Sequence, residues 1–253
     1  MTREHDSGIT RRHLLRQAGA AGVAAAVGGA LDLGRLAAEA DAAVDHPALR
    51  LTPEQEEGPF YVALEKIRRD VRLGRPGVPL HLRLHVVDTA GKPLRNAALD
   101  VWHADAVGTY SDESSQDTVG QTWLRGVQLT STDGVGEFTT IYPGHYQGRT
   151  THVHVKVHVG GRTAAGAYRG GHVSHTGQLF FPDAVSTEVY RLVPYTSNRV
   201  PRTYNGEDGV YTRENGSRVV LKLRKLGAGV PGGFLGAITL VVDPAATPAA
   251  VGR

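Results

Sequence analysis

Cysteine is absent from this chain of 253 residues. Its absence excludes disulfide bonds, thiol nucleophiles and zinc or iron–sulfur sites built on cysteine, so nitrogen and oxygen atoms must hold any bound metal ion. A large excess of one sign of charge is also lacking, since the chain has 28 Lys and Arg and 25 Asp and Glu, for a net charge of +3. The basic residues are scattered along the chain. We therefore expect no nucleic-acid partner.

The first forty residues differ in composition from the rest of the chain. The paired arginines Arg11 and Arg12 precede a weakly apolar run rich in Ala and Gly, and Ala38-Glu39-Ala40 has the small-x-small pattern of a cleavage site. This arrangement resembles a twin-arginine export signal. The apolar run is short and poorly hydrophobic for a bilayer core of about 30 Å. We therefore expect residues 1–40 to direct export to the cell envelope or the exterior, with no stable membrane partner after their removal.

Short stretches of alternating or apolar residues, separated by turn residues, dominate the remaining sequence. Such short strands at near-regular spacing, with 32 glycines in the chain, are typical of an all-β fold. We predict a β-sandwich of two sheets with little helix, and one short helix within residues 182–195. The predicted strands cover residues 80–86, 99–104, 126–131, 137–142, 151–159, 177–181, 218–223 and 238–242.

One predicted strand carries a row of histidines. From Thr151 to Val159, valines alternate with His152, His154, Lys156 and His158. The valine face should pack in the core, because valine prefers a buried pleat. Residues two apart share a face with Cα atoms about 6–7 Å apart, so His152 and His154 can converge on one metal ion. A His-x-His strand is a weak signal alone, since it also suits a solvated polar face.

Five ordered segments strengthen this interpretation. Together they resemble the intradiol ring-cleavage dioxygenases: TPEQEEGPFY (52–61), VWHADAVGTYSD (101–112), RGVQLTSTDGVGEFTTIYPGHY (125–146), RTTHVHV (149–155) and GQLFFPD (177–183). The resemblance implies a β-sandwich that holds one non-haem Fe(III) per chain. Carried over by motif, the metal ligands are Tyr110, Tyr146, His152 and His154.

The resemblance also implies an activity and further site residues. Family members cleave a catechol-type ring between its two hydroxylated carbons with O2, which gives a cis,cis-muconate-type diacid. Tyr146 would then leave the metal and accept a substrate proton, Arg149 would stabilise negative charge on the ring, and Gln178 would support the site. The expected partners are a small aromatic diol and O2, with catechol, hydroxyquinol, protocatechuate and larger catechols left open.

Some features depart from the family pattern. Thr150-Thr151 stand where many members have Pro-Ala, and Gln147 stands where many have Pro, which affects loop shape and substrate fit more than metal binding. The long helical N-terminal segment that builds the dimer of intracellular members has no expected counterpart, so the oligomeric state is not carried over. We expect a signal segment at 1–40, a linker at 41–50, a catalytic β-sandwich at 51–243 and a flexible tail at 244–253.

Two other functions fit parts of the sequence. His103 and Asp105 form an HxD pair that, with a distant histidine, could bind Fe(II) in a 2-oxoglutarate-dependent oxygenase. A secreted β-sandwich with this histidine face could also be a binding module with incidental metal binding. His158 would then be a polar residue at the far end of the face. His145, His172 and His175 fall in predicted loops and could line a pocket.

Overall fold

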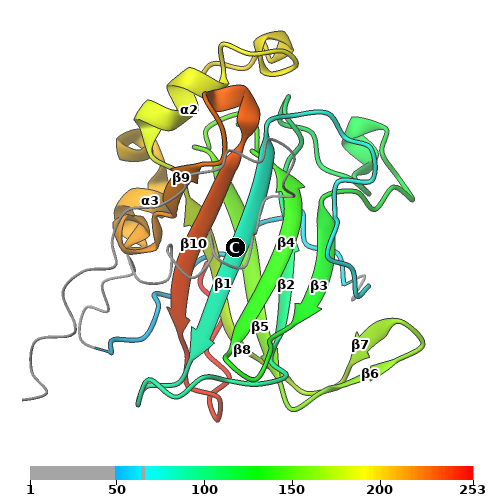
Figure 1. Ribbon diagram of the computed structural model, residues 1–253, viewed down its shortest axis with the longest axis vertical. Helices are drawn as coiled ribbons and strands as arrows, with labels where there is room; N and C mark the ends of the chain where they lie inside the picture. Colours follow the sequence, from blue (N-terminus) through cyan, green and yellow to red (C-terminus); the bar gives the residue numbers. More distant parts are fainter. Residues whose placement is uncertain (1–48, 64–65, 253) are drawn as a thin grey trace, which may run out of the picture. The chain divides into compact units, whose positions relative to one another are not determined.

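Two four-stranded sheets packed face to face form the fold in the computed structural model (Figure 1). The structure describes residues 49–63 and 66–252. The first sheet has the strand order β4-β1-β10-β9, and the second has the order β3-β2-β5-β8. Strand β1 pairs with β10 in parallel, and the other neighbours within both sheets are antiparallel. The predicted all-β sandwich is confirmed.

The elements are short, as the spacing of turn residues predicts. The strands are β1 (Pro79–Val87), β2 (Ala98–Trp102), β3 (Arg125–Leu129), β4 (Val135–Ile141), β5 (His152–Val159), β6 (Arg162–Ala164), β7 (Ala167–Arg169), β8 (His172–Phe180), β9 (Lys222–Lys225) and β10 (Phe234–Val241). The α-helices are α2 (Asp183–Val189) and α3 (Gly209–Arg213). Single 3-10 turns lie at Ser114–Gln116, Tyr195–Ser197, Asn205–Glu207, Gly216–Val219 and Val230–Gly232.

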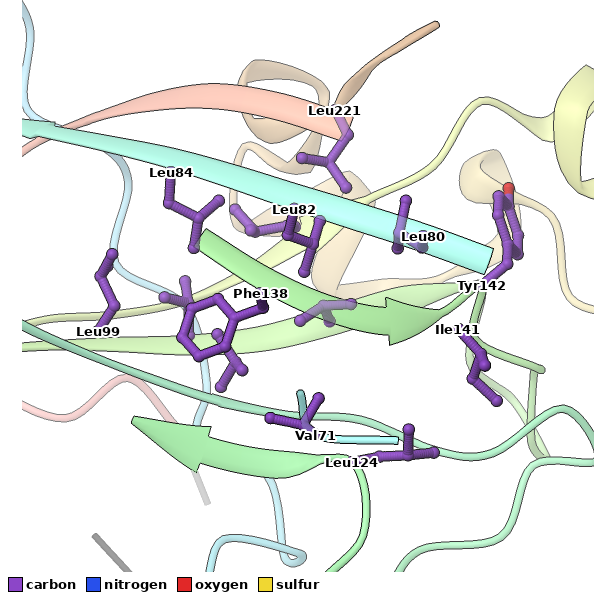
Figure 2. Close-up of a cluster of buried hydrophobic side chains, with 14 of the residues drawn as sticks. Val71, Leu80, Leu82, Leu84, Leu99, Leu124, Phe138, Ile141, Tyr142 and Leu221 are labelled. Atoms are coloured by element: carbon purple, nitrogen blue, oxygen red, sulfur yellow. The ribbon is translucent and has the colours of Figure 1, made fainter. Parts of the chain in front are cut away.

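Alternate side chains of both sheets fill the space between them. Strand β1 contributes Leu80, Leu82 and Leu84, which point into the layer toward Phe138 of β4 (Figure 2). From the second sheet, the valines of β5 join the same core, as predicted from their alternation. The histidine face of β5 therefore points away from the core between the sheets. It is nevertheless buried, because other segments cover it.

The structure corrects the prediction of a strand at 218–223. Residues Gly216–Val219 form a 3-10 turn, and β9 begins only at Lys222. Val219 and Leu221 are both buried. An irregular segment that packs against the core therefore shows the same alternation of apolar residues as a strand. The sequence reasoning also missed the β6–β7 hairpin, which projects from the sandwich (Figure 1), and helix α3.

Several expectations concern the ends of the chain. The signal segment at 1–40 and residues 41–48 of the expected linker lie outside the described residues. The expected flexible tail includes Pro248 to Val251, which line a 180 Å³ pocket together with Glu54, Glu57 and Lys156. Its flexibility stays a prediction. In the described part of the chain, every helix is too short or too polar to cross a bilayer.

Candidate metal centre

Four predicted side chains converge on one point beside β5. The Nε2 atom of His152 lies 3.1 Å from Nε2 of His154, 3.3 Å from the Tyr146 hydroxyl and 3.5 Å from the Tyr110 hydroxyl. Two nitrogen ligands that each lie about 2.1 Å from one ion are about 3 Å apart in neighbouring coordination positions. The spacing of the two imidazoles therefore fits a shared metal ion.

The hydrogen bond of the His152 ring leaves its inner nitrogen available. The Nδ1 atom of His152 donates to the Thr150 carbonyl over 2.6 Å, so in the neutral ring Nε2 carries a lone pair. Burial lowers the pKa of His152 to about 3, with a further contribution from Arg149. Burial also lowers the pKa of His154 well below its usual value. Both rings are neutral at physiological pH, as metal ligation requires.

The two tyrosines bring ionisable oxygens to the same point. Burial, with the adjacent Tyr146, raises the pKa of Tyr110 well above its usual value. Burial likewise raises the pKa of Tyr146, although the Arg149 cation opposes the rise. A phenol in this setting ionises only when a strong cation compensates the negative charge. The described residues contain no cluster of three or more His, Asp or Glu side chains suited to a metal, so a four-ligand site here needs both tyrosines.

A tight loop after β2 positions Tyr110. The Asp105 carboxylate accepts hydrogen bonds from the backbone N–H groups of Val107 and Thr109, each over 3.0 Å. Gly108 has a φ of 89°, and a Cβ there would lie 2.3 Å from the His145 carbonyl oxygen. Only glycine therefore allows this loop to pack against the loop that carries Tyr146.

A short turn positions Tyr146 and Arg149 together. The backbone N–H of Arg149 donates to the Tyr146 carbonyl over 3.1 Å, and β5 begins three residues later. This turn brings Nη1 of Arg149 within 3.4 Å of the Tyr146 hydroxyl. The cation thus lies directly beside one of the four converging donor atoms.

Arg149 is held by groups on three different segments. Its Nε donates to Asp208 over 2.9 Å, Nη2 donates to the Gln178 side-chain oxygen, and Nη1 lies 3.5 Å from Glu56. Gln178 is fully buried, and its amide nitrogen donates to the Glu56 carbonyl over 2.9 Å. Gln178 therefore joins Arg149 to the segment that precedes the sandwich.

Aromatic rings enclose the converging donors. Trp102 stacks on His154 with ring centroids 4.7 Å apart and an angle of 7°. Phe60 stacks on Tyr110 at 4.3 Å and meets Tyr146 edge-on at 5.6 Å. These rings limit the access of water to the donors and so strengthen electrostatic interactions among them.

The HxD pair of the 2-oxoglutarate hypothesis has other roles. Both ring nitrogens of His103 form hydrogen bonds, Nδ1 to the Ala104 carbonyl over 2.8 Å and Nε2 with the Thr140 hydroxyl over 2.7 Å. Burial lowers the pKa of His103 to about 4. Asp105 organises the loop of Tyr110. His103 and Asp105 are therefore structural residues here, not metal ligands.

The other four histidines singled out in the sequence lie outside the donor cluster. His158 is near Asp100, with 3.9 Å between Nε2 and Oδ2, and its ring meets Tyr168 edge-on. The Nε2 atom of His145 lies 3.0 Å from the Val200 carbonyl oxygen. His175 pairs with Glu54 over 2.6 Å, and His172 begins β8 rather than lying in a loop. His175 also lies in β8, which corrects its predicted loop position.

Sequence reasoning missed Glu56, Phe60, Trp102 and Asp208 as site residues. Phe60 and Trp102 stand within the segments quoted for the family resemblance, but no pattern there gave either residue a role. Asp208 carries a detectable signal, since an Asp directly before Gly209 is a favoured N-cap and here accepts from Val210 and Tyr211. That signal predicts a helix start and does not predict the contact with Arg149.

The fold is a β-sandwich, and two tyrosines and two histidines form the donor cluster beside β5. The family model described as Dioxygenase matches residues 56–181. An intradiol ring-cleavage dioxygenase from Tetranychus urticae is 30% identical, with a TM-score of 0.70, and the match covers 79% of this chain and 98% of that one. The chain belongs to the intradiol ring-cleavage dioxygenases.

Two further relatives extend the comparison. The dioxygenase domain of a carbohydrate-binding fusion protein from Streptomyces sp. SirexAA-E is 30% identical over 77% of this chain and 99% of that one, with a TM-score of 0.55. Catechol 1,2-dioxygenase 2 from Acinetobacter lwoffii is 37% identical over 129 residues, which are 47% of this chain and 44% of the relative. The chain thus spans less than half the length of the curated catechol dioxygenases it matches.

Proposed function

We propose that this protein cleaves catechol-type rings between the two hydroxylated carbons with O2, to give cis,cis-muconate-type diacids. One non-haem Fe(III) per chain would be held by Tyr110, Tyr146, His152 and His154. The observation that carries the proposal is the convergence of two phenol oxygens and His154 Nε2 on His152 Nε2, all within 3.5 Å. Catechol and chlorocatechol 1,2-dioxygenases among its relatives support this reaction.

The donor chemistry favours ferric iron. Phenolate is a hard, anionic donor, and two of them suit a small, highly charged ion better than a divalent one. The neutral imidazoles complete a donor set that contains no oxidisable thiolate. Bound there, Fe(III) would supply Lewis acidity that makes the ring carbon of a chelated catecholate reactive toward O2.

The protein's own residues would manage protons and charge. A catechol releases two protons when both of its oxygens become anionic, and the Tyr146 hydroxyl oxygen would accept one of them. Tyr146 suits this role better than Tyr110, which is only 1% exposed and has Phe60 stacked on its ring. Arg149 would stabilise negative charge on the ring as a cation already fixed in place by Asp208 and Gln178.

The visible spectrum tests this function. Protein loaded with ferric iron should show a broad tyrosinate-to-iron band, which should move to longer wavelength when catechol is added without O2. Admission of O2 should then consume one O2 per catechol and yield the muconate, which contains all atoms of both reactants. A colourless protein that ignores catechol would remove this function and leave the metal-binding module of the alternative interpretation.

We further propose that residues 1–40 act as a twin-arginine export signal. The support is the sequence alone: Arg11-Arg12 ahead of a weakly apolar run and the Ala38-Glu39-Ala40 pattern. The test compares cell fractions for the full chain and for the double variant Arg11→Lys with Arg12→Lys. Export that survives the double substitution would contradict the proposal.

A further inference from the structure

Two carboxylates contact the Arg149 guanidinium beside the candidate metal centre. Arg149 contacts Asp208 at 2.9 Å and Glu56 at 3.5 Å. Asp208 is fully buried, whereas the Glu56 side chain is 31% exposed. The three groups together carry a net charge of −1. Of the two carboxylates, only that of Glu56 is partly exposed.

The backbone of Glu56 is fixed on both sides. Its N–H donates to the Glu214 carboxylate over 2.9 Å, and its carbonyl accepts from the Gln178 amide over 2.9 Å. The preceding Gln55 is buried and accepts from the backbone N–H of Gln178 over 2.7 Å. The Glu56 carboxylate is therefore held near the guanidinium by the surrounding fold.

The neighbouring glutamates have other partners. Glu54 pairs with His175 over 2.6 Å, and Glu57 pairs with Lys156. Of these partners, His175 lies on β8 and Lys156 lies on β5. Of the three, Glu56 is the acid that faces Arg149, and one guanidinium nitrogen separates its carboxylate from the Tyr146 hydroxyl.

We infer that Glu56 is a specificity-determining residue that makes the site select neutral catechols over catechols bearing a carboxylate. A ring bound at Tyr146 lies beside Arg149, whose charge Glu56 and Asp208 already balance. The Tyr146 hydroxyl and a Glu56 carboxylate oxygen each lie within 3.5 Å of the same Arg149 nitrogen, so no more than about 7 Å separates them, which is less than the Debye length of about 8 Å. A carboxylate on a ring bound there would gain no free cation and would be repelled by Glu56. Like-charge juxtaposition of this kind disfavours a partner. The inference rests on the proposed function.

The test uses two substrates of the same shape and different charge. The iron-loaded protein is assayed with 3,4-dihydroxybenzamide, which is neutral, and with 3,4-dihydroxybenzoate, which is an anion. The ratio of their kcat/KM values is compared among the wild type, Glu56→Gln and the control Glu188→Gln. Glu188 is a half-exposed acid on α2 that pairs with Lys225 at the surface.

The expected result is a wild-type ratio that strongly favours the amide. Glu56→Gln should lower that ratio on the order of tenfold, the factor that about 1.4 kcal/mol of relieved repulsion gives, and Glu188→Gln should leave it as in the wild type. Binding of both compounds without O2, followed by the visible band, gives the same comparison independently of turnover. An unchanged ratio in Glu56→Gln, or equal losses on both substrates, would overturn the inference. Failure of the wild type to cleave any catechol would instead reject the proposed function.

Discussion

Asp208 and Arg149 form an ion pair across 59 residues of sequence, with 2.9 Å between Oδ2 and Nε. Burial alone would raise the pKa of Asp208, but Arg149 and the N–H groups of Thr150 and Tyr211 together lower it below its usual value. The same carboxylate begins helix α3. One side chain thus connects the loop before α3 with the Arg149 guanidinium beside the candidate metal centre.

Removal of this carboxylate should destabilise the protein strongly. Asp208→Ala leaves a guanidinium that is 13% exposed without its buried partner, and it also removes the acceptor of three backbone N–H groups. We expect a loss of about 3–5 kcal/mol in the free energy of unfolding, measured in urea. Glu188→Gln, which breaks a surface pair, should cost less than about 1 kcal/mol. Similar losses for the two variants would contradict this role.

Substitution of either tyrosine of the donor cluster should change the iron spectrum. Tyr110→Phe and Tyr146→Phe each remove one phenolic oxygen that lies within 3.5 Å of His152 Nε2. We expect a weaker and shifted tyrosinate band and lower iron retention on dialysis against a chelator. Tyr211→Phe is the matched control, because Tyr211 packs edge-on against Phe180. A spectrum unchanged in both cluster variants would refute the ligand assignment.

The contact between the two tyrosine loops depends on Gly108. An alanine there combines an unfavourable φ of 89° with a Cβ 2.3 Å from the His145 carbonyl oxygen. We expect Gly108→Ala to cost about 2–5 kcal/mol in stability and to lower iron retention, because it separates Tyr110 from Tyr146. Gly120→Ala shares a positive φ of 78° but meets nothing within 4 Å. It should cost only about 1–2 kcal/mol and retain the iron band.

Buried neutral His103 should make the protein sensitive to acid. Its pKa is lowered by burial to about 4, from an ordinary 6.5 in the unfolded chain. The unfolded state therefore binds the extra proton first, so the stability contribution is present above pH 6.5 and is lost as pH falls toward 4. Between pH 7 and 5 the loss from this group is about 2 kcal/mol.

The variant His103→Gln isolates this contribution. Urea unfolding at pH 7 and at pH 5 gives the stability difference between the wild type and the variant at each pH. That difference should shift by about 2 kcal/mol in favour of the variant at the lower pH. A difference that does not change with pH would show that His103 is not buried as a neutral ring.

Local pattern predicted most of the sandwich and the two histidines of the donor cluster. The alternation of valine and histidine in β5 specifies both a core face and a face for His152 and His154, because strand geometry has a period of two. Tyr146 and Arg149 entered through the family resemblance, and the structure joins them by a turn in which they are only three positions apart. Tyr110 entered through the family motif, because its contact with His152 joins residues 42 apart.

The surroundings of the donors could not be predicted in the same way. The contacts of Gln178 with Gln55 and Glu56 cross more than 120 residues, and no local periodicity encodes them. Likewise, the segment 218–223 has an alternating pattern but lacks a strand partner for its first residues. Packing between segments far apart in the sequence determines both the contacts of Gln178 and the conformation of segment 218–223.

The contacts of segment 52–61 imply an order of events during folding. Thr52 donates to the carbonyl of Val241 in β10, and Gln55 donates to that of Thr176 in β8. The residues of the first pair are 189 positions apart, so the entropy of closing so long a loop opposes early formation of this contact. We therefore expect the segment that carries Glu56 and Phe60 to dock late, after the histidine strand has paired. In that order of events the two imidazoles would already share one face of β5 before Phe60 stacks on Tyr110, which would leave the proposed metal site open to an entering ion during folding.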